Sequence, residues 1–153
     1  MKLVTKPYGE VEVQEKQRIH FENGIIGFEE VKHYFLLDSR EGGPFYWLQA
    51  ADDPELAFIL MNPRMFRPDY SLDVQESDLR AVGIQTMEEC LDFVILTVPE
   101  DASNISANLM GPVIINRRTR EARQVISLNE EHTTRHYILE EIKDRAGRLV
   151  ETG

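Results

Sequence analysis

The sequence contains a single cysteine, Cys90, among its 153 residues. A disulfide within the chain is therefore excluded, and such scarcity is typical of proteins from a reducing compartment. The sequence also lacks any stretch near the roughly 20 consecutive apolar residues that a membrane-spanning helix requires. Its first residues contain no apolar core of a signal peptide. We therefore expect a cytoplasmic protein without membrane contact.

Basic residues are also scarce, since 17 Lys and Arg stand against 27 Asp and Glu, for a formal charge of −10. An acidic surface repels phosphate groups, so we expect no direct binding to nucleic acid. The same surface attracts basic partners, although acidity serves equally well to keep a protein in solution. The length is typical of one domain, and 42% hydrophobic residues is ordinary for a globular protein.

Short apolar runs separated by turn residues predict an all-β protein, a small antiparallel β-barrel-like single domain with a few short helices. Alternating patterns indicate half-buried strands, and the continuous apolar runs indicate strands that are buried on both faces, although periodicity alone leaves a short buried helix open for the run 56–61. The expected strands are 10–14, 19–21, 34–37, 45–49, 56–61, 93–98, 113–115 and 125–128.

Helix signals are few. Ser77 is placed to cap a helix that stops before Gly83, and Thr86 with Glu89 three residues later matches a capping box. A further helix is expected over 134–143. The sequence shows no repeat, low-complexity segment or long linker.

The domain boundaries follow from these elements. We assign residues 1–143 to the barrel-like domain and residues 144–153 to a polar, mobile C-terminal tail.

Motifs that carry chemistry are missing as well: there is no nucleophile elbow, phosphate loop or dinucleotide fingerprint. His132 and His136 could share one face of a helix and reach a metal ion. Thr133, however, stands where a zinc protease has its general base, and no third ligand follows at a convincing spacing. Cys90 has no family signature of a nucleophile and is expected in the core. We therefore predict no enzyme activity, no metal site and no cofactor.

Three consecutive aromatic residues, Phe45, Tyr46 and Trp47, stand in one expected strand. A strand cannot send all three side chains to the same face. We expect Trp47 to lie in a core layer and keep Tyr46 as a candidate anchor for a partner, because Tyr and Trp are enriched at interfaces.

Three segments together resemble the FliW family of bacterial flagellar assembly factors. Residues 21–29 read FENGIIGFE, residues 44–49 read PFYWLQ and residues 107–116 read ANLMGPVIIN. Each segment alone is weak, but their order and spacing are specific and cover the chain from about residue 3 to 138.

The resemblance implies a partner switch in the cytoplasm. FliW-like proteins bind flagellin, and they bind the translational repressor CsrA, which then no longer silences flagellin messenger RNA. Accumulated flagellin occupies the FliW-like protein and frees CsrA. The resemblance also implies a small antiparallel β-barrel-like fold, in agreement with the expected strands. We expect a monomer when no partner is bound.

The residues that we expect to contact partners come from an aromatic strand, a turn and two acidic segments. They are Tyr46, Asn108, Glu88, Glu89, Glu130 and Glu131. We expect Asn108 in a turn, with Leu109 turned inward and Pro112 opening the next strand. Asn108 either contacts a partner backbone or satisfies only local backbone groups. A small-molecule-binding β-barrel without enzymatic activity stays open as an alternative, because eight strands can enclose one ligand.

Overall fold

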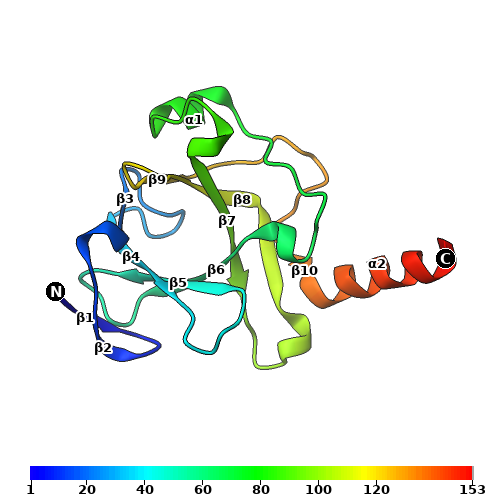
Figure 1. Ribbon diagram of the computed structural model, residues 1–153, viewed down its shortest axis with the longest axis horizontal. Helices are drawn as coiled ribbons and strands as arrows, with labels where there is room; N and C mark the ends of the chain where they lie inside the picture. The colour runs from blue at the N-terminus through cyan, green and yellow to red at the C-terminus, as the bar shows by residue number, and fades with distance from the viewer. Residues whose placement is uncertain (153) are drawn as a thin grey trace.

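The structure, a computed structural model, describes residues 1–152, and it describes side chains through Ala146. Within these residues the strands close into a barrel, with a separate hairpin at one end and few helices (Figure 1). The strands are β1 (Lys2–Thr5), β2 (Gly9–Glu12), β3 (Arg18–Phe21), β4 (His33–Asp38), β5 (Phe45–Ala50), β6 (Ala57–Met61), β7 (Cys90–Thr97), β8 (Ser106–Asn116), β9 (Glu121–Gln124) and β10 (His136–Tyr137). The helices are α1 (Glu76–Ala81) and α2 (Ile138–Thr152), with the short 3₁₀ turns η1 (Glu15–Gln17), η2 (Pro63–Met65), η3 (Met87–Glu89) and η4 (Ala102–Asn104).

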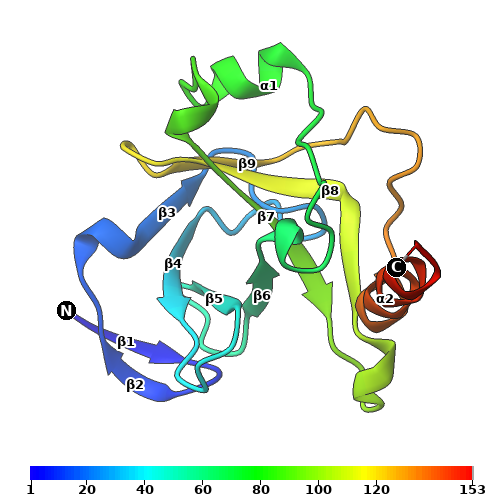
Figure 2. The same cartoon turned by 45° about the vertical axis from the view of Figure 1, so that its right-hand side comes forward.

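The barrel consists of the strands β8, β7, β6, β5, β4, β3 and β9 in that order, and β9 pairs back onto β8 (Figure 2). The predicted all-β, barrel-like fold is confirmed. One pairing departs from the antiparallel expectation, because β3 and β9 are parallel. A closed ring with an odd number of strands cannot alternate direction throughout, so one parallel pair is required. β10 adds to the free side of β8, and β1 and β2 form the separate hairpin.

The continuous apolar runs arise because two core layers sandwich the same strands, as expected for 56–61 and 93–98. Side chains alternate between the two faces of a strand. On β6 and β7, Leu60 and Phe93 therefore belong to the inner cluster, whereas Met61 and Val94 belong to an outer cluster. The segment after η2 and the start of α2 cover that outer layer with Phe66, Tyr70 and Ile138.

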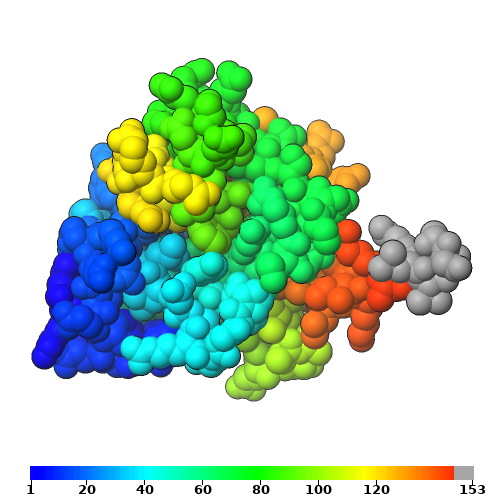
Figure 3. All heavy atoms as spheres, in the orientation of Figure 1, coloured from blue at the N-terminus to red at the C-terminus, as the bar shows by residue number. Residues whose placement is uncertain are grey.

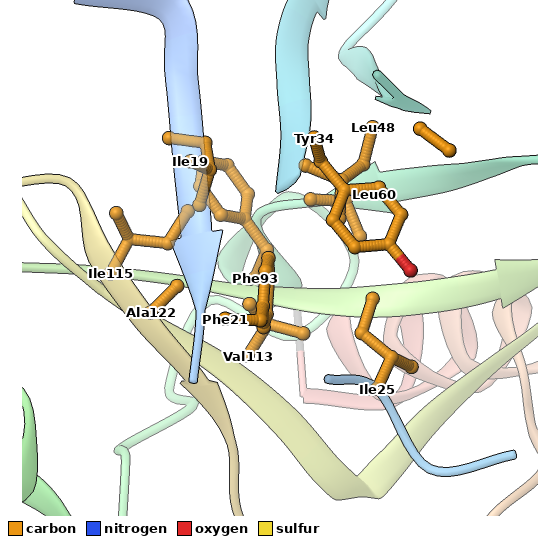
Figure 4. Packing of buried hydrophobic residues seen from close by; sticks show 11 residues of the cluster. Ile19, Phe21, Ile25, Tyr34, Leu48, Leu60, Phe93, Val113, Ile115 and Ala122 are labelled. Carbon is orange, nitrogen blue, oxygen red and sulfur yellow. The ribbon is translucent and has the colours of Figure 1, made fainter. Parts of the chain in front are cut away.

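The interior of the barrel is filled by side chains (Figure 4). Ile19, Phe21, Leu48 and Leu60 are each fully buried. Tyr34 is also fully buried and contacts Phe21 edge to face, with ring centroids 5.3 Å apart. Burial raises the pKa of its hydroxyl to about 12, so it stays protonated at physiological pH.

Smaller elements close the two ends of the barrel. The β1–β2 hairpin packs Leu3 and Val11 against β4, and Gln49 accepts a hydrogen bond from the Lys6 backbone at 2.8 Å. At the other end, Val82 and Ile84 after α1 pack against Ile114 of β8. In the space-filling view the hairpin fills the lower left, and the α1 segment lies over the top (Figure 3).

Several boundaries differ from those expected. No strand forms over 125–128, because β9 ends at Gln124. There the chain leaves the ladder: the Leu128 backbone donates to the Asp73 carbonyl at 2.7 Å, which lies in a different segment. The short strands β1 and β10 were not predicted.

The expected helices fit the structure better. α1 matches the predicted stretch 77–82 to within a residue at each end, but its N-cap is Gln75, so the expected capping role of Ser77 is wrong. η3 matches the capping box, with Thr86 N donating to Glu89 Oε1 at 3.3 Å. The helix expected over 134–143 begins later, at Ile138. The backbone of α2 continues to Thr152, through the segment predicted as a mobile tail. The side chains of 147–153 lie outside the described residues, so the division at 143 and the mobility stay predictions.

Candidate protein-binding surfaces

A large bulge bends β8 in its middle. Ser106–Asn108 pair with Ile95–Thr97 of β7, and Val113–Asn116 pair with Cys90–Phe93, so four residues of β8 stand opposite Val94 alone. Pro112 lies in this unpaired stretch, where its missing N–H costs no ladder hydrogen bond. The expectation that Asn108 lies in a turn and that Pro112 opens the strand is therefore wrong. The burial expected for Leu109 is confirmed, since it is fully buried in the outer cluster.

A chain of amide hydrogen bonds holds the bulge in place. Asn108 Oδ1 accepts from Gly111 N at 2.9 Å, and Gln124 Nε2 donates to the Gly111 carbonyl at 3.0 Å. The other end of the Gln124 amide, Oε1, accepts from Ile26 N at 2.9 Å. This series of hydrogen bonds therefore joins β8, β9 and the loop between β3 and β4. A Cβ at Gly111 would lie 2.8 Å from Gln124 Nε2, so a larger residue there would displace the Gln124 amide from this position.

The loop between β3 and β4 turns sharply and separates two neighbouring isoleucines. Gly24 and Gly27 adopt positive φ angles of 66° and 91°, which glycine tolerates best. The turn buries Ile25 to 2% exposure and leaves Ile26 62% exposed. Phe28 returns to the barrel and meets the Phe58 ring at 5.3 Å.

These elements enclose an open groove of about 450 Å³ on the bent side of the barrel, which we call the bulge groove. Ile26, Met110 and Ile126 stand around it with exposures of 62%, 41% and 53%. Arg135 is its one charged lining residue among the described residues. The full lining is Ile25, Ile26, Phe58, Ile95, Thr97, Asn108, Met110, Gly111, Gln124, Ile126, Thr134 and Arg135. Exposed apolar side chains that cluster in this way mark interaction sites.

A second, smaller hollow of about 270 Å³ lies on the outer face of β5 and β6, and Phe45, Trp47 and Ile59 line it together with Val98. Tyr46 points the opposite way, into the inner cluster, with its ring 5.3 Å from that of Phe93. Phe45, Tyr46 and Trp47 are all half-buried, and Trp47 packs against the core cluster of the β1–β2 hairpin, as expected for a core layer. A partner contact of Tyr46 stays a prediction.

The four candidate glutamates lie in two separate segments. Glu88 is exposed on η3, whereas Glu89 is partly buried because its carboxylate completes the capping box. Glu130 and Glu131 are both exposed in the loop between β9 and β10. That loop also contributes Arg135 to the bulge groove. The acids are therefore free to act electrostatically, and their contact with a partner stays a prediction.

A polar cluster ties the β9–β10 loop and α2 to the rest of the molecule. Arg67 forms an ion pair with Glu141, whose carboxylate also lies 3.3 Å from His136 Nδ1. His132 hydrogen bonds Ser127 Oγ at 2.7 Å through Nδ1. The His132 ring also stacks on the Tyr70 ring, with the two ring centroids 5.5 Å apart. His136 lies on β10 and His132 in the loop before it, so the shared helical face considered from the sequence does not form, although the two rings meet edge to face with centroids 6.2 Å apart.

Burial shifts the titration of both histidines. It lowers the pKa of His132, with the charge of Arg67 adding to the effect, and it lowers the pKa of His136 against the opposing pull of Glu141. Cys90 is likewise buried, and burial raises the pKa of its thiol to about 11. A thiol that stays protonated is a poor nucleophile, which agrees with the predicted core role of Cys90.

The lowered pKa values predict that the protein loses stability below pH 6.5. Unfolded histidines titrate near pH 6.5. As the pH falls through that value, the unfolded chain binds protons that the folded chain does not, so the free energy of unfolding falls. Urea unfolding at pH 7.5 and pH 5.5 should show the loss, and it should shrink in the variant His132→Asn/His136→Gln. An unchanged pH dependence in that variant, matching that of the surface control His33→Gln, would assign the loss to other groups.

Comparison with known proteins places this barrel in a class of bacterial flagellar assembly factors. The family model described as FliW protein matches residues 2–138. The flagellar assembly factor FliW of Treponema denticola is 42% identical over 148 residues, covering 97% of this chain and 99% of the relative. That of Leptospira interrogans serovar Lai is 40% identical, covering 92% and 94%. A crystal structure of the flagellar assembly factor FliW superposes with a TM-score of 0.83 at 36% identity, covering 90% of this chain and 96% of the other.

The chain belongs to the FliW family of flagellar assembly factors. The three segments that suggested this family from the sequence therefore identified it correctly. Two of them, 21–29 and 107–116, supply walls of the bulge groove. Among the described residues, no helix combines the length and the apolar character needed to cross a membrane.

Proposed function

We propose that this protein binds flagellin and the translational repressor CsrA in the cytoplasm, without catalysing a reaction, and so couples flagellin synthesis to flagellum assembly. Membership of the FliW family over residues 2–138 is the observation that carries the proposal. The names of the relatives state a role in flagellar assembly. The exposed apolar groove and the formal charge of −10 fit a protein that works by binding others.

The proposed switch depends on which partner is bound. While CsrA is held, flagellin messenger RNA is translated. When unassembled flagellin accumulates, it occupies the protein, and released CsrA stops further synthesis. An RNA-binding protein carries basic surface to neutralise phosphates, so an acidic protein beside it attracts it and also repels RNA.

A small-molecule barrel is the weaker candidate. A barrel that encloses a ligand needs interior space. Here Ile19, Phe21, Leu48 and Leu60 fill the interior with no exposure, and the bulge groove opens to the outside. The packed interior therefore favours binding of other proteins.

Titration calorimetry with purified flagellin and purified CsrA tests the proposal directly. We expect saturable binding of each partner to the free protein. Failure of both partners to bind, with a correctly folded sample, would overturn the proposal.

A further inference from the structure

The two proposed partners differ in chemistry, and the bulge groove suits one of them. Resting on the proposed function, we infer that the bulge groove is the flagellin-binding surface: it takes an apolar segment of flagellin that places a carboxylate beside Arg135, while CsrA binds elsewhere. Three features of the groove support this assignment: its exposed apolar side chains, its rigid backbone and its single positive charge.

The exposed apolar side chains of the groove supply the surface area that a partner would bury. Ile26, Met110 and Ile126 come from three separate segments, and each is at least 41% exposed. Covering such side chains removes apolar area from water, which is favourable in proportion to the area buried. Subunits that assemble into a filament through buried apolar faces expose those faces while unassembled, so they match this groove.

Rigidity explains why these side chains stay exposed instead of folding inward. Ile26 N is held by Gln124 Oε1 at 2.9 Å, and the Met110 carbonyl accepts from Ser127 N at 2.8 Å. Leu109 N and Met110 N both donate to the Thr133 carbonyl at 3.0 Å. A surface that is ordered before binding loses little conformational entropy when the partner arrives.

The charge distribution discriminates between the partners. Arg135 is the one charged residue that lines the groove within the described part of the chain, although the whole chain carries −10. A basic partner that entered the groove would bring cations beside Arg135, and no acidic side chain lines the groove within the described residues to offset that repulsion. An apolar segment with one carboxylate would instead pair with Arg135, and such charge complementarity confers specificity.

The Asn108 amide adds a polar contact. Its Oδ1 is used by Gly111 N, whereas its Nδ2 makes no hydrogen bond to the described residues. Asn108 lines the groove, so this N–H₂ group is available to donate to a backbone carbonyl of the bound segment. The local role and the partner contact considered for Asn108 are therefore compatible.

The test is the double variant Ile26→Ser/Ile126→Ser, measured against both partners by titration calorimetry. Both side chains are more than half exposed, so their loss should leave the unfolding midpoint nearly unchanged. We expect flagellin affinity to fall roughly 30-fold or more and CsrA affinity to stay within about twofold. The matched control is Leu139→Ser/Ile142→Ser, which removes two exposed apolar side chains of α2 outside the groove and should bind both partners as the parent does.

The charge at Arg135 has its own pair of variants. Arg135→Glu should weaken flagellin binding, whereas Arg135→Lys should retain most of it. Parent-like flagellin binding by the double variant, or an equal loss of CsrA binding, would overturn the assignment of the groove. A parent that binds neither partner would instead overturn the proposed function, and the assignment with it.

Discussion

Replacing Gly24 by Ala should lower the free energy of unfolding by about 3 kcal/mol. Gly24 has a φ of 66°, a region that costs a residue with a Cβ about 1 kcal/mol or more. A Cβ at this position would also lie 2.6 Å from the Cα atom of Glu29. The obstacle is backbone, so the loop that carries Ile26 would have to shift. Urea unfolding monitored by circular dichroism measures the loss.

Gly9→Ala is the matched control for this prediction. Gly9 has nearly the same φ, 65°, but a Cβ there would meet no atom within 4 Å. Its replacement should cost only about 1 kcal/mol, from the backbone conformation alone. Equal losses in the two variants would show that the close packing of Gly24 on Glu29 contributes nothing.

The second large effect is that of surface charge on the rate of association with CsrA. Reversing four acids, Glu88, Glu89, Glu130 and Glu131, to Lys should slow association with CsrA at least roughly tenfold at low salt, because charges around an interface set mainly the association rate. Each reversal adds two units of positive charge, so most of the formal charge of −10 is cancelled. Flagellin binding should respond less, since the bulge groove is mostly apolar.

A control set separates local charge from total charge. Reversing the exposed acids Glu22, Glu30, Glu55 and Glu100 makes the same change in net charge at other positions. Stopped-flow association in 0.1 M and 1 M salt should show the difference between the sets mainly at low salt, because the Debye length falls from about 10 Å to about 3 Å. Identical slowing by both sets would leave total charge as the cause and remove any special role of the four candidates.

The sequence shows that successive side chains of a strand alternate between its two faces. It does not show which of the two faces points into the barrel. The apolar run 56–61 predicted a strand buried on both faces, and the inner and outer clusters confirm it. The same rule put Tyr46 and Trp47 on opposite sides of β5. It could not say which side faced the barrel interior, because apolar layers lie against both.

The bulge in β8 escaped prediction for a different reason. Glycine and proline at 111–112 suggested a turn followed by the start of a strand, because that is their usual meaning in sequence. Their true role depends on Gln124 and Thr133, which are distant in the sequence and contact β8 in the folded barrel. One local signal could have indicated the groove: in Gly24-Ile-Ile-Gly27, a turn this tight must bury one isoleucine and expose the other.

The central claim is that flagellin, once it binds this protein, releases the CsrA that the protein holds, and one titration tests it most directly. The RNA affinity of CsrA is measured alone, then saturated with this protein, and then with flagellin added in steps. We predict that the protein weakens RNA binding by CsrA and that flagellin restores it in proportion to its concentration. RNA affinity that the protein leaves unchanged, or that flagellin fails to restore, would contradict the claim.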